Sequence, residues 1–335
     1  MKAFRVRRVA SLLPVGSLVV SLVALYLIPG LSGQRVTSSN AYDVLQIFSS
    51  VGLLTLGLMI TMVAGEFDLS VVGTYAVGGM LAVKTGEDHP ILGVVVAVLA
   101  GAFAGLIQGG AIAKFRINSM PVTLGGYIAL LGLTSVIGHS QSVSYANIDA
   151  GLRVDQPIAQ IFSLRSLICL ALFAVVFVVM GYGRVGRNVK AVGGDRRAAR
   201  VVGVPVDLYI IGAFVASGAL AALAGALFSY SLNTAVVDPG SAPLIFAASA
   251  ALLGGVSLSG GIGNVAGVLA AGLALSILQE LFTIQATAAY FSDLITGAIL
   301  LLVATLTAPR LIPGLRTLRP RRLVAAVGAP SREDH

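Results

Sequence analysis

Charged residues are scarce in this sequence. Only 11% of the 335 residues are Asp, Glu, Lys or Arg, and 57% are hydrophobic, whereas a soluble globular domain has about 25% charged residues. Because so little polar surface cannot cover a water-facing exterior, the composition excludes an ordinary soluble protein. It indicates that lipid surrounds much of the chain.

The residues that build many metal and redox sites are also few. Cys169 is the only cysteine and lies within an apolar run, so no disulfide can form within the chain and no cysteine-based motif exists. The three histidines, His89, His139 and His335, are far apart and none has metal-ligand spacing. We therefore predict that this chain itself binds no metal and no cofactor.

A nucleotide-binding P-loop is missing as well. No lysine in the sequence follows a glycine, so the pattern G-x-x-x-x-G-K-[ST] cannot occur. If the work of this protein is driven by ATP, a partner chain must bind and hydrolyse it.

Long apolar segments, by contrast, are abundant. A membrane-spanning helix needs about 20 mostly apolar residues, and the candidate segments are 10–29, 44–64, 71–84, 91–113, 120–138, 165–182, 207–229, 242–256, 264–283 and 290–308. The first follows a basic stretch, as in a signal peptide, but it is too long and lacks a cleavage site, so we interpret it as an uncleaved span. The sequence predicts an all-α polytopic membrane protein with about ten transmembrane helices. Two of them, 71–84 and 242–256, are short, and each adjoins a glycine-rich or polar break.

The basic residues predict the orientation of these helices. The net charge of +8 does not indicate a nucleic-acid partner, because the basic residues lie between apolar spans. With both termini in the cytoplasm, 18 of the 22 Lys and Arg residues fall inside, and only Arg35, Lys84, Arg153 and Arg165 fall at or near the outer side. This distribution satisfies the positive-inside rule.

Two segments resemble each other within the chain. Residues 64–82 align with 253–271 at a fixed offset, which matches Gly65 with Gly254 and Ser70 with Ser259. In each segment a span ends at a glycine, a polar break follows, and a helix of small residues begins. Paired broken segments in the two halves of a transporter often mark its translocation site, although chance similarity of Gly/Ala/Leu-rich strings would look the same.

The longest inside loop, residues 183–206, predicts a short helix. Asp195 can cap its N-terminus, residues 196–202 form about two turns, Gly203 suits the C-terminal cap, and Pro205 stops it. Small apolar residues, Ala198 and Ala199 among them, give it an apolar side. Two interpretations remain open: this helix docks into another protein, or it rests on anionic lipid through its arginines.

Four segments carry short patterns rich in small residues. The loop contains GRxxxAxGxxxxAAxxxG, formed by Gly186, Arg187, Ala191, Gly193, Ala198, Ala199 and Gly203. The others are GEFDLSVVGTYAVGG (65–79), GLIQGGAIAKFRINSMPVTLGG (105–126) and AALLGGVSLSGGIGNVAGVLAAG (250–272). In this order they resemble the permeases of ribose/xylose-type sugar ABC transporters, over roughly residues 50–305.

The resemblance implies a function and partners. It implies the permease subunit, itself not an enzyme, of an ATP-binding-cassette importer in the bacterial inner membrane, which moves a small polar solute such as a monosaccharide or related polyol. Two permease subunits, identical or homologous, would pair, ATPase subunits would receive the cytoplasmic loops, and an extracytoplasmic solute-binding protein would deliver the solute. Residues 1–308 would form the transmembrane permease domain and 309–335 a basic cytoplasmic tail.

The sequence departs from the family pattern at polar positions within the spans. Gln108 replaces the usual Asn, Gln279-Glu280 replaces a later Asn-Gly, and no acidic residue follows Asp238 before the last pattern. These departures leave the solute open. The candidate residues of the substrate path are Asp68, Gln108, Thr123, Ser257, Gln279 and Glu280.

Structural explanations compete at several of these positions. Asp68 can instead cap the following helix, and Glu280 and Asp293 can lie at the outer interface. Gly101, Gly105 and Gly109 share a helix face, which predicts close helix packing rather than a lining role. An ion-coupled secondary transporter remains an alternative because of Glu280 and Asp293. An intramembrane enzyme is disfavoured, because no catalytic pair lies within the spans.

Overall fold

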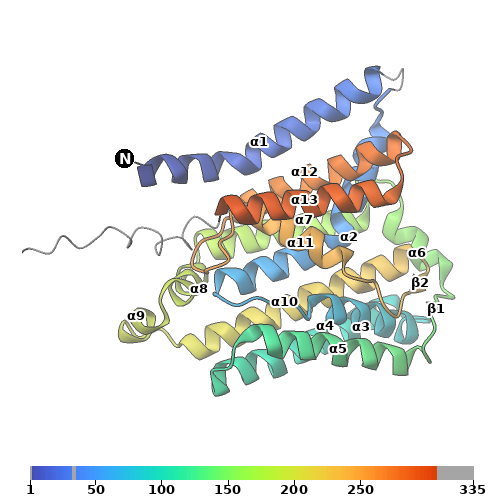
Figure 1. The fold of residues 1–335 in the computed structure, drawn as a ribbon. Helices are drawn as coiled ribbons and strands as arrows, with labels where there is room; N and C mark the ends of the chain where they lie inside the picture. Colours follow the sequence, from blue (N-terminus) through green and yellow to red (C-terminus); the bar gives the residue numbers. More distant parts are fainter. Residues whose placement is uncertain (1, 32–34, 308–335) are drawn as a thin grey trace, which may run out of the picture.

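The computed structural model describes the backbone of residues 2–31 and 35–307, and the side chains of 14–30, 35–288 and 290–305. The predicted basic tail, 309–335, lies outside the described residues. The described chain is mostly helical (Figure 1) and its elements are α1 (Lys2–Leu31), α2 (Ser38–Val63), α3 (Val71–Thr85), α4 (Pro90–Phe115), α5 (Ser119–Ile137), β1 (Val143–Ser144), α6 (Ile148–Asp155), α7 (Leu164–Gly181), α8 (Arg184–Gly194), α9 (Arg196–Val201), α10 (Val206–Ser231), β2 (Thr234–Ala235), α11 (Ala242–Leu253), α12 (Val265–Ile284) and α13 (Ala289–Thr307).

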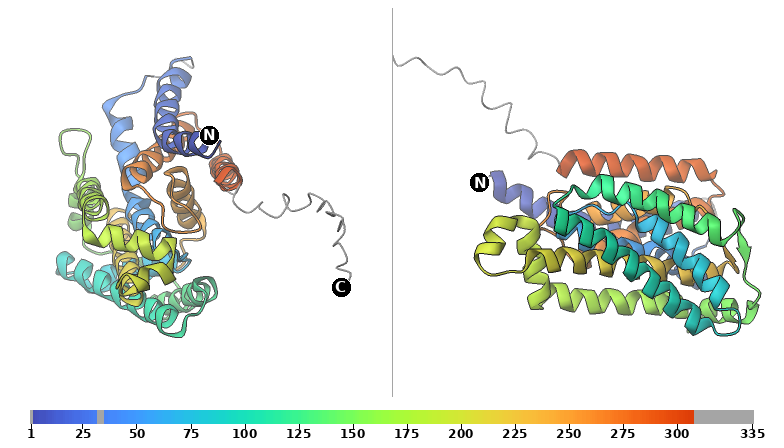
Figure 2. Two further views of the ribbon diagram at one scale, coloured as in Figure 1. Left: turned by 90° about the vertical axis from the view of Figure 1, so that its left-hand side faces the viewer. Right: turned by 90° about the horizontal axis from the view of Figure 1, so that it is seen from below.

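Each predicted span coincides with a helix. Six of these helices, α2, α4, α5, α7, α10 and α12, are long and apolar enough to cross a membrane, and shorter apolar stretches lie in α1, α3, α11 and α13. The helices run roughly along one common axis (Figure 1), and α1 lies at the edge of the bundle against α12 (Figure 2). The prediction of an all-α polytopic membrane protein is therefore confirmed at the level of architecture.

Helix α10 is the centre of the bundle and packs against α2, α3 and α4. Glycines make this packing close. A Cβ atom on Gly101 of α4 would lie 2.3 Å from the carbonyl oxygen of Gly218, and one on Gly105 would lie 2.1 Å from that of Phe214. The predicted packing role of this glycine face is confirmed, because no side chain fits between the two backbones.

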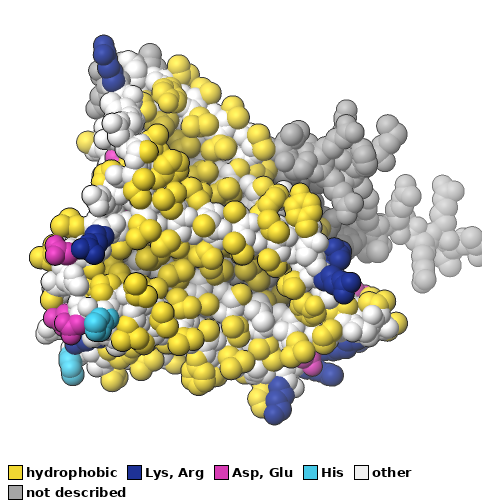
Figure 3. All heavy atoms as spheres, turned by 180° about the vertical axis from the view of Figure 1, so that it is seen from behind, with side chains coloured by type: hydrophobic (Ala, Val, Ile, Leu, Met, Phe, Trp, Pro, Cys, Tyr) yellow, Lys and Arg dark blue, Asp and Glu magenta, His cyan; other side chains and the backbone are white. Residues whose placement is uncertain are grey.

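The two ends of the bundle differ. The start of α1, the end of α13 and both α8 and α9 lie at one end, and α6, β1 and β2 lie at the other (Figures 1 and 2). Figure 3 shows hydrophobic side chains over the middle of one face, with charged side chains gathered toward its edges. The six basic residues of 183–206 and the first residues of the chain thus share an end, as the predicted orientation requires.

Four short elements were not predicted from the sequence. Helix α8 precedes the predicted loop helix, α6 lies in the loop at the opposite end, and β1 pairs with β2 antiparallel, with Val143 opposite Ala235. Just after β1, Tyr145 stacks on Tyr230 with ring centroids 4.5 Å apart. These short elements supply hydrogen-bond partners to loop backbone that would otherwise lack them.

The two similar segments both fold as a helix, a break and a second helix. Gly65 has φ +84° and Gly255 has φ +86°; the amide of Gly65 donates to Met62 and that of Gly255 to Leu252. The structural match is therefore 190 residues apart, one more than the sequence alignment gave. Many unrelated helices end with this hydrogen-bond pattern, so the pattern alone is weak evidence for a repeat. Stronger evidence is that the two breaks touch, since the amide of Gly261 donates to the oxygen of Val63.

The close packing of α4 on α10 can be tested with a matched pair of variants. Gly101→Ala and Gly110→Ala raise helix propensity in α4 equally, but a Cβ at position 110 would meet open space. We expect Gly101→Ala to lower the thermal unfolding midpoint of the detergent-purified protein, by an amount equivalent to about 1–3 kcal/mol of overpacking. Gly110→Ala should leave the midpoint unchanged or raise it, and equal midpoints for the two variants would contradict the packing.

Candidate functional site

A cavity of about 500 Å³ lies toward the end of the bundle that carries β2. Its walls come from α2, α3, the end of α10, the segment after it, the start of α11 and α12: Ile47, Ser50, Val51, Tyr75, Ala76, Phe228, Ser229, Thr234, Val236, Asp238, Pro239, Ala242, Pro243, Phe246 and Gln279. Ligand pockets in proteins typically measure about 300–1,000 Å³. The cavity therefore has room for a small solute such as a sugar.

The lining combines aromatic rings with uncharged polar groups. Tyr75 and Phe228 face each other with centroids 6.0 Å apart, while Ser229, Thr234 and Gln279 supply two hydroxyls and an amide. Of the described residues that line the cavity, Asp238 alone carries a charge. Flat apolar faces and a few neutral hydrogen-bonding groups suit a molecule with many hydroxyls and no net charge.

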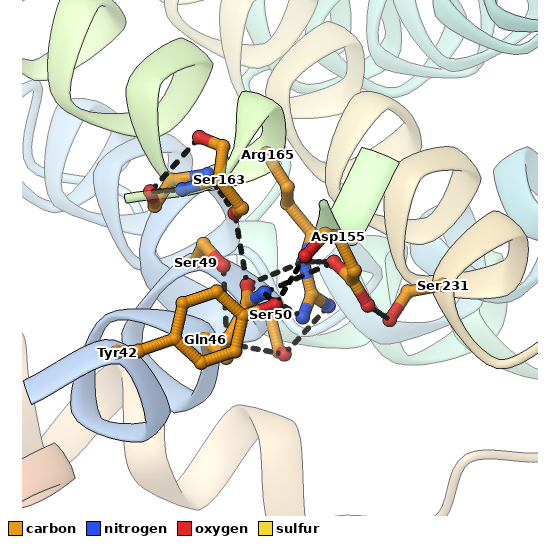
Figure 4. A network of polar contacts seen from close by, with 9 residues as sticks. Tyr42, Gln46, Ser49, Ser50, Asp155, Ser163, Arg165 and Ser231 are labelled. Carbon is orange, nitrogen blue, oxygen red and sulfur yellow. Dashed lines mark hydrogen bonds and ion pairs between the residues drawn. The ribbon is translucent and has the colours of Figure 1, made fainter. Parts of the chain in front are cut away.

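A buried arginine, Arg165, forms a network of polar contacts beside the cavity (Figure 4). Arg165, at the start of α7, is only 4% exposed. Its Nε atom lies 3.2 Å from Oδ1 of Asp155, at the end of α6, and its Nη2 donates to Oε1 of Gln46 over 2.9 Å. The Nη1 atom donates over 3.1 Å to the hydroxyl of Ser50, which lines the cavity.

The partners of Arg165 extend the network to a fourth helix. Gln46 donates to Tyr42 and to Asp155, and Tyr42 donates to the backbone oxygen of Asp155. On the far side, the hydroxyl of Ser231 of α10 donates to Asp155. Because α2, α6, α7 and α10 all contribute, this cluster fixes the cavity walls at the end of the bundle that carries α6 and β2. We call Tyr42, Gln46, Ser50, Asp155, Arg165 and Ser231 the arginine network.

Sequence reasoning did not identify the arginine network. It placed Arg165 among four outer basic residues and assigned it no partner. A cation at the start of an apolar span, in a chain with few charges, was the available signal, since such residues usually have a specific partner. Asp155 is ten residues from Arg165, whereas Gln46 and Ser50 are more than a hundred residues away, and no local pattern marks any of these partners.

Of the six residues predicted for the substrate path, only Gln279 lines the cavity. Ser257 lies in the break between α11 and α12, where its hydroxyl is 2.8 Å from that of Ser259. Gln108 is buried on α4, and its side chain lies against Gly126 of α5, outside the cavity.

Asp68 and Thr123 hold the break between α2 and α3. Asp68 accepts hydrogen bonds from the backbone and hydroxyl of Ser70 and, over 2.9 Å, from the hydroxyl of Ser217 near the middle of α10. Thr123 donates to the backbone oxygens of Ser119 and Phe67. Asp68 therefore holds Ser70, the residue just before α3, and links this break to α10.

The two membrane acids do not form an ion pathway. Glu280 is buried and accepts a 2.8 Å hydrogen bond from Asn40, close to the start of α2. Asp293 is exposed near the start of α13. A secondary transporter needs acids at the middle of the membrane that can bind a coupling ion, and neither residue is placed for that role.

The predicted loop helix is present as α9. Oδ1 of Asp195 accepts hydrogen bonds from the amides of Arg197 and Ala198 at 2.8 and 3.1 Å, and Gly203 ends the turn with φ +81°. Helix α8 precedes it and buries Gly186 and Val189, with Gly186 directly against the backbone of Met180.

Part of the apolar side of α9 packs on the helix bundle and part of it is exposed. Ala199 is 2% exposed and packs on Ile112, Phe214 and other residues of the bundle. Of the two alanines only Ala198 remains open, so the expectation that a partner approaches at both is corrected. The exposed apolar tip consists of Val201 and Val202, which are 86% and 75% exposed.

Several known proteins are similar in sequence to this chain. Residues 40–304 match the family model described as branched-chain amino acid transport system / permease component. The chain is 31% identical, over 79% of each sequence, to the L-arabinose ABC transporter permease protein AraH of Azospirillum brasilense. It is 27% identical to the ribose import permease protein RbsC of Escherichia coli K12, covering 85% of this chain and 91% of that protein. It is 28% identical to the D-allose transport system permease protein AlsC of the same strain, covering 82% and 85%.

Loss of the buried cation should weaken the fold at the end of the bundle that carries α6. Arg165→Gln leaves Asp155 without its ion-pair partner and deprives Gln46 and Ser50 of donors. We expect a loss of about 2–3 kcal/mol in stability, below the range for a fully buried pair because the Asp155 side chain is 29% exposed. Thermal unfolding of the purified protein measures it, and Arg153→Gln, at an exposed arginine of α6, is the control that should change nothing.

Proposed function

Because the chain belongs to the family of branched-chain amino acid transport system permease components, which its similarity over residues 40–304 shows, we propose that it moves a small sugar through the cavity beside Gln279. It is a permease subunit of an ABC importer and a multi-pass protein of the inner membrane, and it is not an enzyme. Relatives named for arabinose, ribose and allose support a monosaccharide as the solute.

The chemistry of the cavity favours a sugar over an amino acid. A bound amino acid at neutral pH carries a carboxylate, which requires a cation or several backbone amides nearby. No lysine or arginine is among the described lining residues, and the hydrogen bonds of Arg165 are directed to Asp155, Gln46 and Ser50. A neutral polyol needs only the hydroxyl, amide and carboxylate groups that the lining offers.

We propose that other subunits supply the functions of the transporter that this chain does not provide. ABC importers work with ATPase and solute-binding subunits, and we propose that ATP is bound and hydrolysed by the ATPase partner. The exposed tip of α9, Val201 and Val202, is the proposed contact with it. A second permease subunit, the same chain or a homologue, completes the transporter.

We further propose ten spans with both termini in the cytoplasm. The ten helices that match the predicted spans and the placement of α8, α9 and the start of α1 at one end of the bundle support this topology. In this orientation the cavity lies in the outer half of the membrane, where an extracytoplasmic binding protein releases its solute. Transport then proceeds by alternating access, with the cavity closing outward and opening inward.

The solute proposal is tested by uptake into proteoliposomes that contain the permease, its ATPase and its binding protein. We expect ATP-dependent uptake from a panel of ribose, arabinose and allose, and none of leucine. Gln279→Leu should lower sugar uptake about two- to ten-fold, the effect of losing one hydrogen bond. Gln108→Leu, at a buried glutamine outside the cavity, should transport at the parental rate, and uptake of leucine alone would contradict the proposal.

The topology is tested by labelling single cysteines in intact cells. In a Cys169→Ser background, we place cysteine at Asp149 of α6 and at Val201 of α9, both of which are exposed. An impermeant thiol reagent should label position 149 from outside and label position 201 only after the cells are broken. Labelling of position 201 in intact cells would invert the orientation.

A further inference from the structure

The two breaks and the end of α8 meet at one point, which we call the glycine junction: Gly65, Gly193, Gly260 and Gly261. A Cβ atom on Gly193 would lie 1.9 Å from the backbone oxygen of Val63 and 2.6 Å from the amide nitrogen of Gly261. A Cβ on Gly260 would lie 2.6 Å from both the oxygen of Gly193 and the Cα of Gly65. Backbones from three distant parts of the sequence are therefore in direct contact.

Hydrogen bonding joins the two breaks at this junction. The amide of Gly261, after α11, donates over 2.9 Å to the oxygen of Val63, the last residue of α2. Because the contacts are backbone to backbone, no flexible side chain can absorb a relative movement of the three segments. A displacement of α8 must therefore shift the breaks or open the junction.

One ion pair connects the loop to the first break. Arg196, the first residue of α9, lies with its Nη2 atom 2.5 Å from Oε1 of Glu66, and the same nitrogen is 3.4 Å from the oxygen of Gly65. The side chain of Glu66 is 7% exposed and that of Arg196 is 40% exposed. A buried carboxylate needs such a partner, and here the partner belongs to the cytoplasmic loop.

From Glu66 a short chain of contacts reaches the cavity. The next residue, Phe67, is held by Ser119 and Thr123 of α5, and Asp68 is bonded to Ser217 of α10. Helix α3 then starts at Val71 and carries Tyr75 and Ala76, which form part of the cavity wall. A pull on Glu66 therefore acts, through fewer than ten residues of chain, on the helix that lines the cavity.

We infer that the Glu66–Arg196 pair is the positioning contact through which movement of α8 and α9 displaces α3 and changes the cavity. This inference rests on the proposed function, because it assumes that an ATPase moves the loop. Glu66 is not among the residues that line the cavity. Its removal should therefore uncouple the two activities rather than abolish either one.

The test compares solute uptake with ATP hydrolysis in the same proteoliposomes. The probe is whichever of ribose, arabinose and allose the parental complex takes up fastest. For Glu66→Gln, which keeps the shape of the side chain, we expect ATP hydrolysis to continue while the sugar moved per ATP falls at least about five-fold, the lower end of typical coupling effects.

A matched control exists on the same helix. Arg200 of α9 pairs with Asp207 of α10 at 3.1 Å, with side chains 41% and 55% exposed. Asp207→Asn removes one carboxylate from a pair with the same loop, but this pair does not reach a break. The sugar moved per ATP should stay at the parental value in this variant, and a loss equal to that of Glu66→Gln would overturn the inference.

Variants at Arg196 keep the test decisive if Glu66→Gln fails to assemble. The side chain of Arg196 is more exposed than that of Glu66, so replacing it should destabilise the fold less. Arg196→Gln should uncouple the transporter and Arg196→Lys, which keeps the charge, should restore most of the coupling. The inference would be overturned if the ratio of sugar uptake to ATP hydrolysis stayed at the parental value in both Glu66→Gln and Arg196→Gln. This includes the case in which uptake and hydrolysis fall in parallel. A parental complex without ATP-dependent sugar uptake would instead contradict the proposed function.

Discussion

Direct contact between backbones is the constraint on which the rest of the structure depends. In lipid, apolar side chains gain little by leaving the surrounding hydrocarbon, so helices must associate through close packing and hydrogen bonds. Glycines allow α4 to meet α10 at Gly101 and Gly218 and allow α3 to meet α10 at Gly225, where a Cβ would lie 1.9 Å from the oxygen of Tyr75. The glycines at these contacts follow from this need.

The helices were predictable because the bilayer alone sets how long and how apolar a spanning segment must be. Every apolar segment of the sequence is a helix in the structure, and the cap formed by Asp195 follows from local chemistry. The pairing of β1 with β2 was not predictable. Each strand has only two residues and the strands lie about ninety positions apart in the sequence, so no local pattern marks them. Helix α8 was missed because its residues read as a polar, glycine-rich loop, and its apolar face becomes evident only when it lies on the bundle.

The candidate site was predictable only in part. Gln279 was selected because it replaces a polar residue of the family pattern within an apolar helix, and it does line the cavity. Asp68 and Thr123 were selected from motifs, yet they hold the start of α3, since a short motif records a structural need as readily as a functional one. Ala199 was selected for its small size, which turns out to serve packing on Phe214. The arginine network and Glu66 depend on contacts between distant segments, which one sequence cannot reveal.

Hydrogen bonds at the end of the bundle that carries β1 and β2 bear on how the cavity can change. The hydroxyl of Tyr230 donates to the oxygens of Ala82 on α3 and Pro90 on α4, and Tyr145 donates to Gly86. Together with the glycine contacts, these bonds join α3, α4 and α10 into one closely packed group. The walls of the cavity come from α3 and α10 of this group and from α2, α11 and α12. The size of the cavity therefore depends on the spacing of whole helices, and a change in that spacing would reshape it without any helix unwinding.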